Sequence, residues 1–217
     1  MAVKKPTRER ILDAALTLFN EHRFAKVTTA QVAKACGIAE GNLWYHFNDR
    51  EALLEGLLER FSNQVENRLA ITPSKNDILE DYAAFYLMMA DELSSYRFFY
   101  RDQRDYEALI GKLSDRFPDL YSRTAKQFRT FLTALSDDGH VDFSEQKIAS
   151  ITTVSLMIFR YASEFTREAN IPLGQGADLV HYAFRLHMTL YEDSLTPAAK
   201  DILTRRFCLE PMSEYLL

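Results

Sequence analysis

The chain has 217 residues, of which 47% are apolar, enough to form a buried core and too many for an intrinsically disordered chain. Its net charge of −5 is unevenly spread: residues 1–50 carry three more positive than negative charges, and residues 51–217 carry eight more negative than positive charges. Seven Gly and six Pro are too few for the regular turns of a strand-rich fold, so the sequence predicts an all-α protein.

The sequence also argues against a secreted or membrane-spanning protein. Cys36 and Cys208 lie far apart, which suggests neither a disulfide framework nor a zinc site and fits a reducing compartment. The basic N-terminus lacks the apolar segment that a signal peptide would place behind it. The longest uncharged stretch, residues 148–159, has twelve residues, whereas a membrane-spanning helix needs about 20. We therefore expect a cytoplasmic protein.

The first part of the chain contains two helical segments. Apolar residues recur at helical spacing from Ile11 to Phe19, which predicts an amphipathic helix. Thr28 and Gln31 then have the spacing of a capping box, in which each side chain satisfies the other's backbone N–H. A second helix is therefore expected over residues 29–36.

Gly37 marks a tight turn after this second helix, because glycine readily adopts the left-handed conformation beyond a helix end. Residues 38–47 form a third, short helical segment in which Leu43 and Phe47 share one face. Two short helices joined by a Gly turn are typical of a helix-turn-helix, whose second helix fits the major groove of DNA.

A longer helix is expected from Asp49 to Leu69, after which Thr72-Pro73-Ser74 interrupts the chain. We expect a helix-turn-helix DNA-binding domain at residues 1–50, a connecting helix at 51–72 and a helical domain at 73–217. The helices expected in the last domain span residues 76–94, 104–113, 118–137, 144–169, 177–193 and 197–208, with one of the breaks at Phe117-Pro118.

Four segments together resemble the TetR family of transcriptional regulators: Ile11 to Leu16 with Phe19, Val32 to Ile38, Gly41 to Phe47, and Glu51 to Leu54. The resemblance covers about residues 7–55, and the remainder shares only the layout. It implies an N-terminal three-helix DNA-binding domain followed by a helical effector-binding and dimerisation domain.

The resemblance also implies which residues face DNA. Thr28 and Thr29 would place the start of the second helix against a phosphate, and Arg50 would hold another, which agrees with the attraction of helix N-termini for anions. The residues expected at the DNA interface are Thr28, Thr29, Gln31, Glu40, Gly41, Asn42, Trp44, Tyr45, His46 and Arg50.

Three residues allow two interpretations each. Glu40 departs from the basic or neutral residue common in the family, and it either accepts a hydrogen bond from cytosine N4 or points into solvent. Trp44 is either a core residue or, as we expect because Leu43 and Phe47 fill the inward face, exposed. Cys36 is expected to be a small buried apolar residue rather than a redox sensor, because no second cysteine lies nearby.

Aromatic and Met residues concentrate between Tyr82 and Tyr106. Such residues fill a plain helical core or line a pocket for an apolar ligand, and the family resemblance favours a pocket. The residues expected to line it are Phe85, Tyr86, Met89, Phe99, Tyr100 and Tyr106.

The helices at 144–169 and 177–193 are apolar around much of their circumference, so each is expected at the centre of the domain or at a subunit interface. In the TetR family the last two long helices form a four-helix bundle across a dimer axis. The resemblance therefore implies a homodimer, with an interface expected at Ile151, Ser155, Phe159, Val180, Ala183, Phe184 and His187.

The sequence predicts no catalytic residue, no cofactor and no metal, since the spacing of His140, His181 and His187 does not suit a metal site. The expected partners are double-stranded operator DNA, a second copy of the chain and a small-molecule effector, with no membrane. The function that fits best is a repressor that a small, apolar effector releases from DNA. The alternatives are a ligand-independent activator or architectural regulator and, with little support, a helical enzyme or small-molecule carrier.

Overall fold

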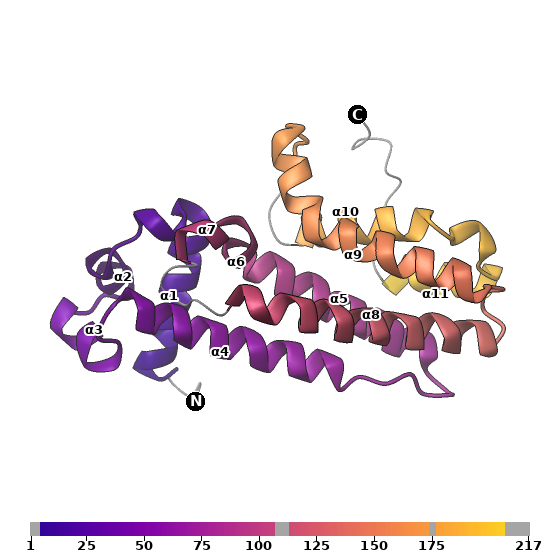
Figure 1. Ribbon diagram of the computed structural model, residues 1–217, viewed down its shortest axis with the longest axis horizontal. Coiled ribbons are helices and arrows are strands. Elements are labelled where there is room, and N and C mark those ends of the chain that lie inside the picture. The colour runs from indigo at the N-terminus through magenta and orange to yellow at the C-terminus, as the bar shows by residue number, and fades with distance from the viewer. Residues whose placement is uncertain (1–4, 107–112, 174–176, 207–217) are drawn as a thin grey trace. The chain divides into compact units, whose positions relative to one another are not determined.

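The computed structural model of the chain describes residues 5–106, 113–173 and 177–206, and every regular element in these ranges is helical (Figure 1). The expectation of an all-α fold is confirmed. Among the described helices, none combines the length and the apolar character that crossing a lipid bilayer requires.

The chain folds into two compact units. Unit 1 comprises Met1–Gln64 and Ser95–Arg116, and unit 2 comprises Val65–Ser94 and Phe117–Leu217. The expected functional domains, with boundaries at residues 50 and 72, stay a prediction. The compact units divide the chain differently, because the division falls inside the long helix α4 (Arg50–Leu69) and because a later stretch of chain returns to unit 1.

Unit 1 contains the three N-terminal helices, the first part of α4 and two short later helices. Its elements are α1 (Thr7–His22), the 3-10 turn η1 (Phe24–Lys26), α2 (Thr29–Cys36), α3 (Glu40–His46), α6 (Arg97–Arg101) and α7 (Gln103–Tyr106). Phe19 of α1 packs against Phe24 and Phe98, with ring centres 5.0 and 5.3 Å away. These aromatic contacts join α6 to the N-terminal helices.

Unit 2 is a bundle built mainly from α5 (Ile78–Ser95), α8 (Leu113–Asp137), α9 (Glu145–Glu168), α10 (Ala177–Thr189) and α11 (Pro197–Arg206), with the 3-10 turn η2 (Glu192–Ser194). Its core is rich in aromatic rings. Phe85 of α5 stacks on Phe131 of α8 with ring centres 5.0 Å apart, and Tyr86 lies 4.2 Å from Phe184 of α10. These rings fix the helices of the bundle against one another.

The predicted helix break at Phe117-Pro118 is wrong, because α8 continues through Pro118. Pro118 stands in the second turn of the helix, where its fixed φ suits the helix although its missing N–H removes one helical hydrogen bond and its ring crowds the carbonyl four residues earlier. Of the helix expected at 104–113, the described residues show α7 at Gln103–Tyr106, while 107–112 lie outside the described residues. Cys208 also lies outside them.

Candidate nucleic-acid interface

The helix-turn-helix begins with the capping box expected from the sequence. The backbone N–H of Thr28 donates to Oε1 of Gln31 over 2.8 Å, and the N–H of Gln31 donates to the Thr28 hydroxyl over 3.3 Å. Helix α2 ends at Gly37, whose φ of 67° and ψ of 36° lie in the left-handed region. Local sequence alone therefore fixes both ends of α2 and the turn that leads into α3.

Helix α3 has one buried face and one exposed face. Leu43 is buried with Phe47, the residue that caps the helix end. Tyr45 and Trp44 point outward, with 86% and 54% of their surface exposed, as expected for Trp44. Gly41 and Asn42 are also exposed, and His46 is half-buried with its ring against that of Tyr45. The exposed face therefore offers aromatic rings and polar side chains to a partner.

Glu40 makes a contact that sequence reasoning missed. One of its carboxylate oxygens, Oε1, accepts a hydrogen bond from the Thr29 hydroxyl over 2.9 Å. Because Thr29 begins α2 and Glu40 begins α3, this bond ties the first turns of the two helices together. The other carboxylate oxygen is compatible with either predicted orientation, toward a base edge or toward solvent.

Arg50, the first residue of α4, holds the segment that precedes α2. Its Nη1 atom donates to the carbonyls of Phe24, Ala25 and Val27, each over 3.3 Å. The guanidinium carbon also lies 4.4 Å from the centre of the Phe24 ring. The phosphate contact expected for Arg50 would therefore use its other nitrogens while Nη1 keeps this segment in place.

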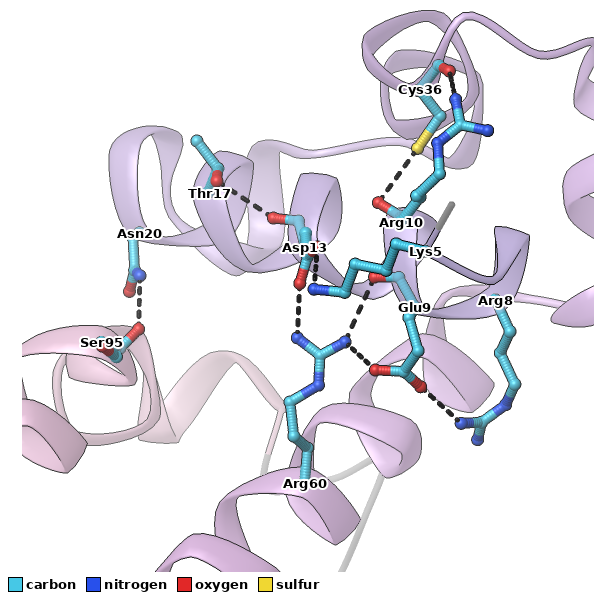
Figure 2. Close-up of polar contacts among 10 residues, drawn as sticks. All are labelled: Lys5, Arg8, Glu9, Arg10, Asp13, Thr17, Asn20, Cys36, Arg60 and Ser95. Atoms are coloured by element: carbon cyan, nitrogen blue, oxygen red, sulfur yellow. Dashed lines mark hydrogen bonds and ion pairs between the residues drawn. The ribbon is translucent and has the colours of Figure 1, made fainter. Parts of the chain in front are cut away.

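Two sets of polar contacts join α1 to α4 and to α2 (Figure 2). Arg60 of α4 donates to Asp13 over 2.8 Å and to Glu9 over 2.7 Å. Arg10 donates to the Cys36 carbonyl over 2.8 Å, and the Cys36 thiol donates to the Arg10 carbonyl over 3.4 Å. Burial raises the pKa of the Cys36 thiol, which fits a packing role rather than a reactive one.

The six residues expected to line an effector pocket fall in both compact units. Phe85, Tyr86 and Met89 are buried in unit 2. Phe99 and Tyr106 are buried in unit 1, where Tyr100 is half-buried. Neither unit therefore brings all six together, and only the first three belong to the core of the helical bundle.

The bundle core instead contains a hydrogen-bonded cluster that sequence reasoning missed. The hydroxyls of Tyr82 and Tyr191 lie 2.8 Å apart, and the Tyr191 hydroxyl lies 2.9 Å from Nε2 of His187. Nδ1 of His187 lies 2.7 Å from the hydroxyl of Ser155, which itself donates to the Ile151 carbonyl. These residues come from α5, α9 and α10 and from the chain just after α10, so no local pattern predicts their meeting.

The cluster fixes the protonation of His187. Burial lowers the pKa of His187 to about 3, so the imidazole is neutral at physiological pH. Since the Ser155 proton goes to a carbonyl, Nδ1–H donates to Ser155 and Nε2 accepts from one tyrosine hydroxyl, while the other hydroxyl donates to the first. Burial also raises the pKa of Tyr82, so these hydroxyls keep their protons.

The residues expected at the dimer interface lie mostly in the core of a single chain. The buried ones are Ile151, Ser155, Phe159, Ala183, Phe184 and His187, while Val180 is half-buried. The large apolar side chains that α9 exposes are Val154, Met157, Tyr161 and Phe165. Their spacing of three or four residues places them along one stripe of the helix. Periodicity marked α9 as apolar on two sides but did not tell which side faces its own chain.

Within the described parts of the chain, His, Cys, Asp and Glu side chains do not gather in groups of three or more that could hold a metal ion.

Two family descriptions match the chain. Residues 11–57 match the bacterial regulatory proteins of the tetR family, and residues 60–203 match a family described as bacterial transcriptional repressors.

Similar proteins agree with these matches. The chain is 39% identical over 54 residues to the HTH-type transcriptional regulator UidR of Escherichia coli strain K12, a match that covers 25% of this chain and 28% of UidR. It thus spans little more than a quarter of that regulator's length.

Solved structures extend the similarity over nearly the whole chain at the level of fold. A TetR-family regulator from Marinobacter aquaeolei VT8 superimposes with a TM-score of 0.76 at 24% identity, covering 96% of this chain and 100% of that one. SmeT, the repressor of a Stenotrophomonas maltophilia multidrug efflux pump, was solved with triclosan and superimposes with a TM-score of 0.56 at 18% identity, covering 89% of this chain and 93% of that one.

Proposed function

Because this chain belongs to the TetR family of bacterial transcriptional regulators, we propose that it is a sequence-specific DNA-binding repressor that a small, apolar effector releases from its operator. The observation that carries the proposal is the exposed face of α3, where Tyr45 and Trp44 project while Leu43 is packed beneath them. Large aromatic side chains exposed beside polar ones mark a binding surface. A major groove admits one helix with such a face.

We assign the DNA contacts to the residues expected from the sequence. In this assignment Asn42 and Tyr45 contact base edges, and the start of α2 at Thr28 binds a phosphate, since helix N-termini attract anions. The positive excess of residues 1–50 supports phosphate binding there, while the acidic remainder of the chain discourages contact with DNA elsewhere.

The apolar stripe on α9 supports a homodimer. Met157, Tyr161 and Phe165 each keep 45% or more of their surface exposed in the single chain, although they stand on one helix face. A second copy that packs the same stripe against this one would cover both, as in a two-fold symmetric interface. Two α3 helices would then read the two halves of a palindromic operator.

The core of unit 2 is our candidate effector site. Phe85, Tyr86 and Met89 supply apolar contact, and the tyrosine hydroxyls beside His187 supply hydrogen bonds that a polar group on the effector can replace. SmeT was solved in complex with triclosan, an apolar molecule that carries a hydroxyl. This match in chemistry supports a small, largely apolar effector with a hydrogen-bonding group.

The alternative is an activator or architectural regulator that keeps its DNA affinity whatever ligand binds. Bound duplexes selected from random DNA by the full chain give the operator, and the affinity for that duplex is then measured with and without triclosan and related phenols. We expect binding that weakens steeply with salt and falls when an effector is present. Affinity unchanged by every compound that binds the protein would favour the alternative.

The DNA-facing assignment has its own variant test. Tyr45→Ala together with His46→Ala should abolish specific binding while the chain stays folded. Arg129→Ala, which removes an exposed cation on α8, should leave binding unchanged. Specific binding that survives the double substitution would rule out α3 as the helix that reads the DNA sequence.

The proposed function also implies a location. A repressor that acts on bacterial chromosomal DNA would work in the cytoplasm.

A further inference from the structure

The segment between α1 and α2 contains a strained residue. Arg23 has φ 72° and ψ 146°, a backbone conformation that residues other than glycine rarely adopt. It is exposed, so no buried side chain explains the conformation. Such strain persists only where the surrounding structure holds the backbone on both sides.

Two neighbouring residues provide that hold. Arg101, at the end of α6, donates to the carbonyls of Phe19 and Asn20, both over 2.7 Å, and so binds the last turn of α1 just before Arg23. Asp102 accepts the backbone N–H of Phe24 over 2.8 Å and so binds the chain just after Arg23. We call this pair, Arg101 with Asp102, the clasp.

The clasp is itself firmly bonded. Two nitrogens of Arg101 lie 2.7 Å from the two carboxylate oxygens of Asp102, which is only 2% exposed. Asn20 adds two more bonds to the same region: it donates to the Ser95 carbonyl over 2.7 Å and accepts the N–H of Phe98 over 3.1 Å (Figure 2 shows the Ser95 contact). Helix α6 is therefore tied to the end of α1 through the backbone and not only through apolar packing.

The segment held by the clasp leads directly to the DNA-facing residues. Phe24 is contacted by Asp102 at its N–H and by Arg50 at its carbonyl and its ring. The next residues run to Thr28, which caps α2. Any displacement of Phe24 therefore shifts both Thr28 and Arg50, the two residues assigned to phosphates.

We propose that the Arg101–Asp102 clasp holds Arg23 in its strained conformation and thereby positions Thr28 and Arg50 for DNA, so that Asp102 is a positioning residue for operator binding. The inference rests on the proposed function. Residues 96–106 follow α5, which carries Tyr82 and Tyr86 of the candidate effector site and ends at Ser95, whose carbonyl accepts a hydrogen bond from Asn20.

The test compares Asp102→Ala with Asp105→Ala in the full chain, using the duplex selected by the unmodified protein. Both variants remove one carboxylate from the same stretch, but Asp105 is exposed. We expect Asp102→Ala to lower operator affinity about tenfold, or ~1.4 kcal/mol. We also expect the dependence of log affinity on log salt to become shallower by about one for each phosphate that the variant no longer binds. Asp105→Ala should change neither quantity.

A rescue experiment separates positioning from a general loss of stability. Glycine adopts the Arg23 conformation without strain, so Arg23→Gly added to Asp102→Ala should restore most of the affinity and the salt dependence. Hydrogen exchange of residues 23–31 should become faster in Asp102→Ala and return toward the unmodified rate in the double variant. A general loss of stability would leave the salt dependence of the remaining binding unchanged, which the positioning role does not.

Two results would overturn the positioning role of the clasp. One is an Asp102→Ala chain whose operator affinity and salt dependence are unchanged. The other is an Asp102→Ala chain whose affinity Arg23→Gly does not restore. An unmodified chain that selects no duplex at all overturns the proposed function instead. Where Asp102→Ala does not fold, Asp102→Asn keeps an acceptor for the Phe24 N–H but loses the charge that pairs with Arg101. It should show the same changes at smaller size, and an Asn variant without them overturns the clasp as well.

Discussion

Arg68, in the last turn of α4, forms an ion pair with Glu92 of α5 that is almost entirely withdrawn from solvent. Nε of Arg68 lies 3.0 and 3.1 Å from the two carboxylate oxygens. Its other nitrogens donate to Gln127 and Thr124 of α8 over 3.1 and 3.2 Å. All four residues belong to unit 2, so the end of α4 is fixed to two helices of the bundle by buried polar groups.

Breaking this pair should strongly destabilise the chain. Arg68→Met leaves the Glu92 carboxylate buried without its partner, and we expect a loss of about 3–5 kcal/mol in the free energy of unfolding, measured by urea denaturation. The control is Arg123→Ala, which breaks an exposed ion pair with Glu66 and should cost less than about 1 kcal/mol. Similar losses of stability in the two variants would show that the buried Arg68–Glu92 pair contributes no more to stability than the exposed pair.

Glu92 should make stability fall as pH rises. Burial raises its pKa from 4.5 to about 7, although Arg68 acts in the opposite direction. The folded chain therefore binds this proton more tightly than the unfolded chain, and the stabilisation is complete below pH 4.5 and is lost as pH rises through 7. The free energy of unfolding, measured against Glu92→Gln, should decline over this range by up to about 1.4 kcal/mol per pH unit. A difference in the free energy of unfolding between the two proteins that does not change with pH would contradict the prediction.

His187 should have the opposite effect. Burial lowers its pKa from 6.5 to about 3, so the unfolded chain takes up a proton that the folded chain excludes. Its contribution is present above pH 6.5 and is lost as pH falls toward 3. As the pH is lowered from 7.5, the free energy of unfolding of His187→Gln should therefore fall by less than that of the unmodified chain. Because the two windows overlap, each variant is compared separately with the unmodified protein.

Two glycines of the helix-turn-helix should respond in opposite ways to alanine. Gly37→Ala puts a side chain on a left-handed residue, which costs about 1 kcal/mol of stability even though no atom lies within 4 Å of the added carbon. Gly41→Ala lies within α3 with equally open surroundings, and should raise stability by up to about 0.5 kcal/mol. Thermal unfolding measures both changes. Gly41→Ala should also weaken operator binding, because in the proposed complex its methyl group would face the DNA.

The dimer interface can be tested on the exposed stripe of α9. Met157→Glu places a charge where a second copy would cover the side chain, and we expect the chain to sediment with the mass of a single protomer. Thr130→Glu, at an exposed position of α8, should leave the dimer intact. If both variants remain dimeric, the copies meet elsewhere. If the unmodified chain is already a monomer, the stripe has another partner.

The sequence was most informative where structure depends on neighbouring residues. Thr28, Gln31 and Gly37 define both ends of α2 within ten residues of chain, and the inward position of Leu43 implied the outward position of Trp44. Helix α2 could therefore be predicted with its boundaries, whereas the short helix expected at residues 38–47 spans only Glu40–His46. The same reasoning failed at Pro118, where a break was expected with a helix beginning at residue 118, whereas Pro118 stands in the second turn of α8.

Contacts between distant residues could not be read in the same way. His187 and Tyr82 meet although 105 residues separate them, and only the packing of α5 against α10 reveals that His187 is an internal hydrogen-bonding residue. Apolar periodicity likewise identified α9, but two residues that the family resemblance led us to expect at the dimer interface, Ser155 and Phe159, are buried within the single chain. A helix with two apolar faces gives no signal in its own sequence for which face its own chain covers.

The return of residues 95–106 to unit 1 affects how this regulator can be recombined with others. Phe98 and Tyr106 complete the aromatic packing around Phe19 and Phe24, so the DNA-reading module is encoded in two separate stretches of the gene. A chimera that joins the first 64 residues to a foreign sensor would leave those rings uncovered. Exchange of sensors between such regulators should therefore succeed only when the later stretch is transplanted along with the first.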